Sequence, residues 1–305
     1  MRDVRRVKWF VRDLGQKFAP RLLLGVLARR SWLHEPEIAL LPLLAPRSLT
    51  AIDAGANKGV YLHHLSRSFD RVVAFEPLPA LARYLKRAAP RNSKVHPVAL
   101  SDHEGEAELC LPAGFNELGS IEPGHTVAAA GTGDGGAVEV HRVRTSPLDS
   151  YGLERVGLLK IDVEGHELAV LAGARRLIAD WRPVVMVEVE ERHRTGGVAA
   201  VHRFFAEQDY DGFFLDGDRL RPLQEFDPAR DQNTQALSQS VKVGRYINNF
   251  IFIHQSWSTE RVAEINRWLK LRAPVSPPTG RLGEVIASAR RLLGGARVAM
   301  PRPRV

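Results

Sequence analysis

The sequence has almost no cysteine and no long hydrophobic run. Cys110 is the one cysteine among 305 residues, which excludes a disulfide scaffold and a cysteine-rich zinc site and fits a reducing cytoplasm. The richest apolar stretches, Leu22–Ala28 and Ile38–Ala45, fall short of the roughly 18 residues that a membrane-spanning helix needs. The basic N-terminus lacks the long apolar core and cleavage site of a signal peptide, so we expect a cytoplasmic protein.

Excess positive charge is absent from the middle of the chain. The net charge is +8, yet residues 51–260 carry 23 Lys and Arg against 29 Asp and Glu, whereas residues 1–50 carry 10 against 4 and residues 261–305 carry 10 against 2. A nucleic-acid enzyme usually has its basic surface on the folded core, so no nucleic-acid partner is expected. The basic ends suggest solvated tails or peripheral contact with an anionic membrane, through an amphipathic segment near residues 281–293.

Strand and helix patterns alternate from residue 49 onward. The hydrophobic spacing predicts strands at 49–53, 71–77, 94–102, 156–162 and 183–190, and helices at 58–69, 78–89, 165–180 and 196–208. Alternation at this spacing predicts right-handed crossovers and a mostly parallel sheet with helices on both faces, an α/β fold.

Three further segments complete the expected organisation. Residues 102–147 form a glycine-rich insertion, residues 210–223 form a hairpin around Asp216-Gly217-Asp218, and residues 248–254 complete the sheet. We divide the chain into a basic helical N-terminal segment (1–48), a main domain (49–256), and a C-terminal helix with a basic, proline-rich tail (257–305).

The stretch AIDAGANKGVYLHHL (51–65) is typical of a strand, turn and helix whose backbone lies against a bound ligand. An apolar strand ends on Asp53, and Gly55 and Gly59 precede a helix. Glycines allow a sharp turn and a close approach, and a helix start offers unpaired N–H groups. A phosphate-binding loop is excluded because Lys58 precedes a glycine and then a valine, and a dinucleotide fingerprint would need glycine at Asn57.

S-adenosylmethionine fits this turn better, because it has no pyrophosphate. Its zwitterionic end can bind the Asp53 region and the turn amides, including those of Ala56 and Asn57. Glu76, followed by Pro77, ends the second strand 23 positions after Asp53, where a carboxylate can accept both ribose hydroxyls. The alternatives are a sugar-nucleotide transferase or NAD enzyme, and a non-catalytic adaptor with a cofactor fold at a membrane surface.

The third predicted strand ends on Ser101 and Asp102, at the same edge of the sheet. At that position the two side chains could meet the amino group of an adenine. Three strand ends in register therefore predict a nucleoside site.

These motifs, in this order, resemble the FkbM-type S-adenosylmethionine-dependent methyltransferases. The resemblance implies a class I (Rossmann-like) methyltransferase fold with a seven-stranded sheet and one antiparallel strand. It also implies methyl transfer, usually to a hydroxyl of a sugar, polyketide or other natural product. The segments that carry it are IDAGANKGVY (52–61), AFEP (74–77), VALSD (98–102), NELGS (116–120), SPLDSYG (146–152), LLKIDVEGHELAVLAGA (158–174), RPVVMVEV (182–189) and NNFIFI (248–253).

Methyl transfer of this kind needs positioning and a group that takes the acceptor proton. Asp162 and Glu164, at the tip of the fourth strand, are the best candidates for a base or an orienting group. Lys160 lies on the same strand face as Asp162, which predicts a contact that is either a structural ion pair or part of catalysis. His166 is either a base or a residue of the helix start.

A magnesium site is an alternative at the same edge, although we assign no metal ligands. Glu188 and Glu190 share one face of the fifth strand and, with Asp162, could supply oxygen ligands. The acceptor, a small molecule or a glycan, is expected to bind among the 102–147 insertion and the 190–197 and 210–235 loops.

Overall fold

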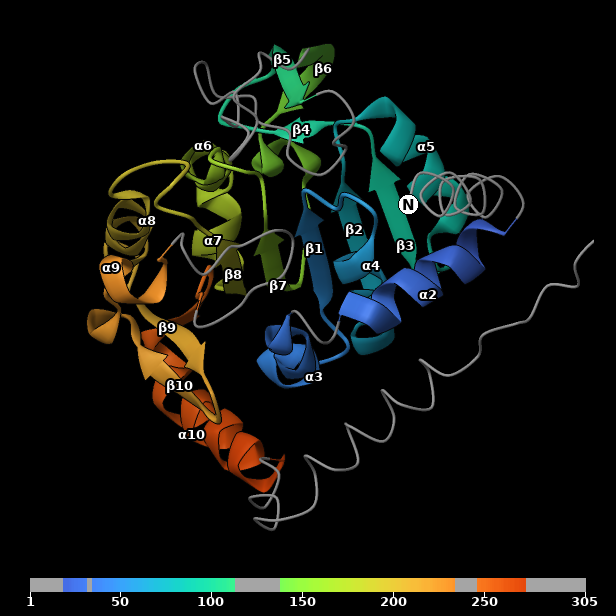
Figure 1. The fold of residues 1–305 in the computed structure, drawn as a ribbon. Coiled ribbons are helices and arrows are strands. Elements are labelled where there is room, and N and C mark those ends of the chain that lie inside the picture. Colours follow the sequence, from blue (N-terminus) through green and yellow to red (C-terminus); the bar gives the residue numbers. More distant parts are fainter. Residues whose placement is uncertain (1–18, 32–34, 113–137, 234–245, 273–305) are drawn as a thin grey trace, which may run out of the picture.

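The computed structural model describes residues 19–31, 35–112, 138–233 and 246–272 (Figure 1). Its centre is an eight-stranded sheet with the order β10-β9-β11-β8-β7-β1-β2-β3. The strands are β1 (Thr50–Ala54), β2 (Arg71–Phe75), β3 (Ser93–His96), β7 (Val156–Ile161), β8 (Val184–Glu188), β9 (Tyr210–Asp216), β10 (Arg219–Pro222) and β11 (Asn249–His254).

The strand directions confirm the expected fold class and correct the strand number. Strands β3, β2, β1, β7 and β8 run parallel to one another, and β11 lies antiparallel between β8 and β9. The eighth strand, β10, pairs antiparallel with β9. It is the second arm of the predicted hairpin around Asp216-Gly217-Asp218, where Gly217 has φ +62°, so this motif is a turn, as its flanking alternation indicated.

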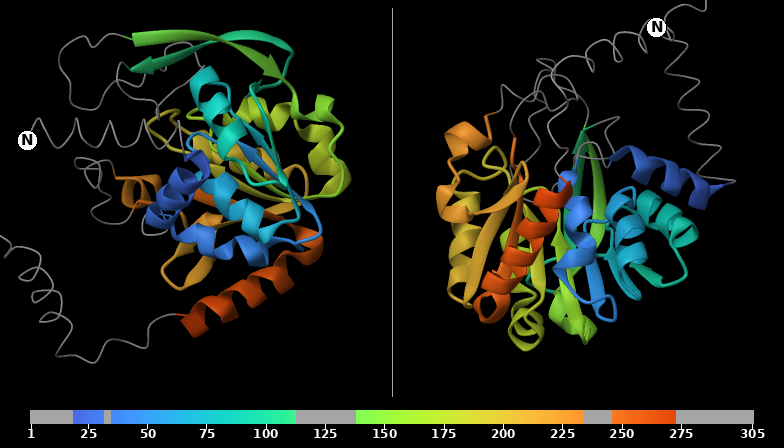
Figure 2. Two further views of the ribbon diagram at one scale, coloured as in Figure 1. Left: turned by 90° about the vertical axis from the view of Figure 1, so that its right-hand side faces the viewer. Right: turned by 90° about the horizontal axis from the view of Figure 1, so that it is seen from below.

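Helices cover both faces of the sheet (Figure 2). Successive strand residues alternate between two cores, as Ala51 and Ile52 do, so each strand is buried on both sides. One core packs against α2 (Pro20–Ser31), α3 (Leu41–Leu44), α4 (Val60–Ser68), α5 (Pro79–Ala88) and α10 (Gln255–Arg272). The other packs against α6 (Glu167–Ala172), α7 (Arg175–Trp181) and α8 (Gly197–Ala206).

The remaining short helices are η1 (Pro36–Leu40), η2 (Leu148–Tyr151), η3 (Leu223–Glu225) and α9 (Pro228–Asp231). The single helix predicted at 165–180 is two helices, α6 and α7. The break lies at Gly173, where a Cβ would stand 2.0 Å from the backbone oxygen of Ser101. The backbone at Ser101 therefore lies too close to position 173 for any residue other than glycine.

The predicted third strand, 94–102, is wrong in its second half. The main sheet keeps only Ser93–His96, because Pro97 has no N–H to donate to a ladder. The chain then joins a separate sheet with the order β4-β6-β5, made of β4 (Ala99–Leu100), β5 (Gly105–Pro112) and β6 (Val138–Ser146). The insertion thus contributes two β-strands, β5 and β6, which stand above the carboxyl edge of the main sheet (Figure 1).

Several predictions fall on segments that the structure does not describe. These are the NELGS motif (116–120), the amphipathic segment near 281–293, and the outermost parts of both basic ends. Within residues 19–31, 35–112, 138–233 and 246–272, no helix combines the length and the hydropathy that crossing a bilayer requires.

Candidate active site

The turn between β1 and α4 is built against the end of β7. Gly55 and Gly59 have φ values of +83° and +84°, and Asn57 between them has +48°. The amide of Asp162 donates to the backbone oxygen of Ala54 over 3.0 Å. A Cβ on Gly55 would therefore lie 1.8 Å from the backbone oxygen of Asp162. The glycine is required both by its dihedral angle and by this close approach.

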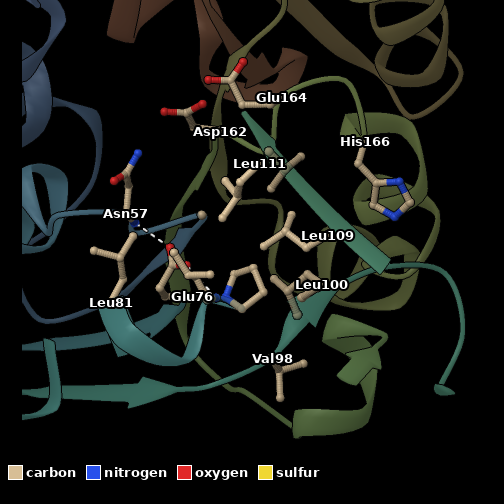
Figure 3. Close-up of a pocket in the computed structure, with 15 residues that line it drawn as sticks. Asn57, Glu76, Leu81, Val98, Leu100, Leu109, Leu111, Asp162, Glu164 and His166 are labelled. Atoms are coloured by element: carbon tan, nitrogen blue, oxygen red, sulfur yellow. Dashed lines mark hydrogen bonds between the residues drawn. The ribbon is translucent and has the colours of Figure 1, made fainter. Parts of the chain in front are cut away.

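Glu76 is held at the end of β2 by backbone amides. Its Oε2 accepts a hydrogen bond of 2.7 Å from the Asn57 amide, and its Oε1 accepts one of 2.8 Å from the Leu78 amide (Figure 3). Burial raises the pKa of Glu76 to about 7, although both hydrogen bonds favour the charged form. The β1–α4 turn and the β2 tip are thus one unit, since the carboxylate joins them.

An open, mostly apolar cavity of about 680 Å³ lies beside Glu76. Figure 3 shows that Leu109 and Leu111 of the insertion face Glu76 and Leu100 across it. The cavity is lined by Gly55, Asn57, Glu76, Pro77, Leu78, Leu81, Val98, Ala99, Leu100, Leu109, Leu111, Asp162, Val163, Glu164 and His166. An apolar slot bordered by the carboxylates of Glu76, Asp162 and Glu164 suits a nucleoside.

A second cavity, of about 830 Å³, is more polar and lies on the other side of the turn. It shares Gly55, Asn57 and Asp162 with the first, so the two cavities meet at the turn and at the tip of β7. Its lining is Leu27, Glu35, Asp53, Gly55, Ala56, Asn57, Lys58, Val60, Tyr61 and Asp162. Together the cavities form one site with an apolar end and a charged end.

Lys160 is fully buried beneath this junction. Its Nζ lies 3.8 Å from Oδ2 of Asp162, which is the contact predicted from strand alternation, and 3.9 Å from Oε2 of Glu188. The ammonium also lies 4.8 Å from the centre of the Tyr61 ring. Burial alone would lower the pKa of Lys160, but the surrounding carboxylates raise it, so the lysine stays charged.

Asp53 is the cross-strand neighbour of Lys160. It is buried, and its Oδ2 has no hydrogen-bond partner among the residues that the structure describes. Burial raises the pKa of Asp53 to about 7, while the charge of Lys160 acts to lower it. A buried carboxylate oxygen without a partner beside a cavity is a position that a ligand donor would satisfy.

The tips of β7 and β8 carry carboxylates that crowd one another. Burial, with the charges of Asp162 and Glu190, raises the pKa of Glu164 to about 8. Oε2 of Glu164 lies 3.4 Å from Nε2 of His193. Burial and the charge of Asp162 likewise hold the pKa of Glu188 well above its usual range. Raised pKa values of this kind are common in active sites.

The magnesium hypothesis finds no support in these positions. Glu190 is bound by Arg192 and by the Tyr246 hydroxyl, and Glu188 accepts a hydrogen bond from the Asn248 amide. In the described ranges, no group of three or more His, Cys, Asp or Glu side chains is gathered so as to hold a metal ion.

Ser101 and Asp102 are placed differently from the other predicted donor-binding residues. His166 lines the apolar cavity, and its Nε2 lies 3.0 Å from Oγ of Ser101. Ser101 and Asp102 themselves are not among the lining residues of either cavity, and Asp102 is exposed beside His103. The contact of this pair with an adenine stays a prediction, as do the roles of Glu164 and His166.

Sequence reasoning missed several residues of the site. Leu109 and Leu111 come from the insertion, Glu35 comes from the N-terminal segment, and Tyr246 comes from the chain before β11. Nothing in the local spacing of these residues indicates a site, because their partners are distant in the sequence.

Comparison with known proteins identifies one matching domain family. Residues 53–211 match the family described as Methyltransferase FkbM domain. Over 173 residues the chain is 31% identical to the 31-O-demethyl-FK506 methyltransferase FkbM of Streptomyces tacrolimicus, a match that covers 48% of this chain and 65% of that enzyme. It is 29% identical over 198 residues to Methyltransferase sdnD of Sordaria araneosa, covering 54% of this chain and 75% of sdnD.

Two further matches are less extensive or more distant. The chain is 33% identical over 196 residues to the AMB antimetabolite synthetase AmbE of Pseudomonas aeruginosa, a match that covers 52% of this chain but 9% of the synthetase. Among solved structures, the methyltransferase FkbM of Methylobacillus flagellatus is 18% identical, with a TM-score of 0.42 and coverage of 68% of this chain and 44% of that chain.

Proposed function

This chain belongs to the FkbM methyltransferase family, and from that premise we propose that it transfers a methyl group from S-adenosylmethionine to a hydroxyl group of a small molecule or glycan. Methyl transfer from a donor of the S-adenosylmethionine type follows from the family. The hydroxyl acceptor is supported by the carboxylates at the tips of β7 and β8. It is also supported by the Streptomyces relative, whose name gives an oxygen as the methylated atom.

The observation that carries the proposal is the meeting of the two cavities at Asp162. In the apolar cavity, Glu76 would hold the ribose hydroxyls, and Leu81, Leu100 and Leu109 would enclose the base. In the second, charged cavity, Asp53 would face the amino-acid end of the methyl donor. When bound, the donor supplies a methyl group already activated on a positively charged sulfur.

The remaining task of the protein is to place the acceptor hydroxyl and to take its proton. Asp162 borders both cavities, and 30% of its side chain is exposed, so it can orient the hydroxyl. Glu164, beside His193, is the group that we assign to accept the proton, since a base with a pKa near the working pH is efficient. Lys160 is a positioning residue, because it acts by holding Asp162.

Two measurements test the function. In a thermal-shift titration the protein should be stabilised by S-adenosylhomocysteine and not by NAD or UDP, since a ligand that binds only the folded state raises its stability with concentration. The protein and a donor labelled with carbon-13 in the methyl group are then incubated with sugars, glycans and polyketide alcohols, and with their amino analogues. The carbon-13 chemical shift of the product distinguishes an O-methyl from an N-methyl group.

O-methyl products from the alcohols are expected. A shift with NAD or UDP and none with S-adenosylhomocysteine would remove the donor assignment. Products that form only from the amino analogues would replace the hydroxyl by a nitrogen acceptor and leave the donor assignment standing.

A further inference from the structure

Residues 19–31 and 35–49 pack onto the domain beside the charged cavity. Helix α2 lies against α4 and α5 (Figure 1), and Leu24 is part of the same core as the sheet residues. The Tyr84 hydroxyl lies 3.4 Å from the backbone oxygen of Pro20, and Nε2 of His64 lies 3.2 Å from that of Ala28. This segment lies outside residues 53–211, which match the family.

Two side chains of this segment, Leu27 and Glu35, line the charged cavity. Glu35 stands at the start of η1, where its backbone oxygen accepts from the Ile38 amide over 3.2 Å. Its charge acts on the groups around the cavity. After burial, Glu35 is the largest cause of the raised pKa of Tyr61, and it also raises the pKa of Asp53. Glu35, Asp53 and Tyr61 thus line one cavity and act on one another electrostatically.

Among the residues that the structure describes, acidic side chains outnumber basic ones along the charged cavity. Glu35, Asp53 and Asp162 all border it. Lys160 lies beneath and is shared with Glu188, while Lys58 is at the lining. A buried carboxylate is stabilised by a cationic neighbour. The cavity is thus complementary to a ligand that brings a positive charge.

We propose that Glu35, together with Asp53, binds the ammonium group at the amino-acid end of the methyl donor. The inference rests on the proposed function and extends it, because it assigns a donor-binding residue to the N-terminal segment. The family-matched domain alone would then have an incomplete donor site, since one of the two acidic groups comes from outside it. The nucleoside end of the donor, which would lie in the apolar cavity beside Glu76, does not depend on Glu35.

The test compares two ligands that differ at the amino-acid end, by isothermal titration calorimetry on the full chain. S-adenosylhomocysteine carries the ammonium, and 5′-methylthioadenosine has the same nucleoside and sulfur without it. Glu35→Gln should weaken S-adenosylhomocysteine roughly tenfold, the effect of losing a charge-assisted hydrogen bond, and should leave 5′-methylthioadenosine unchanged. Glu76→Gln, a change at the ribose position, should weaken both ligands. Glu260→Gln, at an exposed position of α10, should weaken neither.

A change in the ligand covers the case in which the Glu35 variant folds poorly. The deaminated analogue of S-adenosylhomocysteine should bind the parent protein at least as weakly as S-adenosylhomocysteine binds Glu35→Gln, because it loses the contact with Asp53 as well. The two deletions should not add when they are combined, because they remove the same interaction.

The outcomes separate the two claims. Equal weakening of both ligands by Glu35→Gln, no weakening of either, or full affinity of the parent for the deaminated analogue would each overturn the role of Glu35. A parent protein that binds neither nucleoside would instead overturn the proposed function itself.

Discussion

The two halves of the carboxyl edge hold their acidic groups in different ways. On the β1–β2 half, both oxygens of Glu76 accept hydrogen bonds from backbone amides of the adjoining turns. On the β7–β8 half, Glu188 and Glu190 are held by side chains, among them Asn248 and Tyr246. A carboxylate held by backbone amides depends on the path of the chain. A carboxylate held by side chains can lose its hydrogen bonds through a single substitution. We therefore expect substitutions to be tolerated less well on the β1–β2 half than on the β7–β8 half.

The largest effect is expected from Gly55→Ala in the backbone-held half. The added Cβ would meet the backbone oxygen of Asp162 at 1.8 Å, at a φ of +83°, so either the turn or the end of β7 must move. We expect loss of measurable S-adenosylhomocysteine binding and a cost in unfolding free energy above about 3 kcal/mol, to be measured by calorimetry and by urea denaturation.

Gly217→Ala is the matched control for that substitution. Gly217 also has a positive φ, +62°, but a Cβ there would meet nothing within 4 Å. Its cost should be the dihedral penalty alone, about 1–2 kcal/mol, with donor binding intact. Similar costs at the two glycines would contradict the close approach of β7 to the turn.

The next effect concerns Lys160, which lies where the two halves meet. Lys160→Met should lower the unfolding free energy by about 3–5 kcal/mol, because Asp162 and Glu188 would lose a buried counter-charge. The exposed lysine of β3 offers a comparison, since Lys94→Met should change stability by about 0.5 kcal/mol or less. A Lys160→Met protein as stable as its parent in urea would mean that these carboxylates take up protons instead of relying on the lysine.

The smallest effect should come from the side-chain-held half. Glu164→Gln should reduce kcat about a hundredfold and change donor affinity far less, since the amide keeps the shape of the side chain that lines the apolar cavity while it removes the proposed base. The pKa of Glu164 is raised to about 8, so the protonated, inactive form prevails below that value. The rate of the parent should therefore rise with pH through about 8.

The pH profile separates a base from a structural residue. In Glu164→Gln the rise of the rate near pH 8 should vanish, whereas a structural role would lower the rate at every pH and keep the shape of the profile. Glu154→Gln, in the loop before β7, should keep both the rate and the profile. A profile that survives in Glu164→Gln would move the proton-accepting role to another group, such as Glu188 or His166.

Part of the sheet could be predicted because its signals are local. Short apolar runs placed β1, β2, β7 and β8, and the alternation around Asp216-Gly217-Asp218 identified the hairpin of β9 and β10. The third strand was predicted too long because the apolar residues on both sides of Pro97 look alike in sequence. Only the structure separates Val95, which pairs with β2, from Ala99, which pairs with β6.

The sequence by itself determined the β1–α4 turn, since Gly55 and Asn57 carry the required backbone conformation and Glu76 follows at the next strand end. It also determined the approach of Lys160 to Asp162, because side chains two residues apart on a strand point to the same face of the sheet. Tertiary structure alone decided that Leu109 lines the apolar cavity, that Glu35 lines the charged cavity, and that the Asn248 amide reaches Glu188. These contacts join segments far apart in the chain, so they depend on how whole elements pack, which no local pattern of residues records.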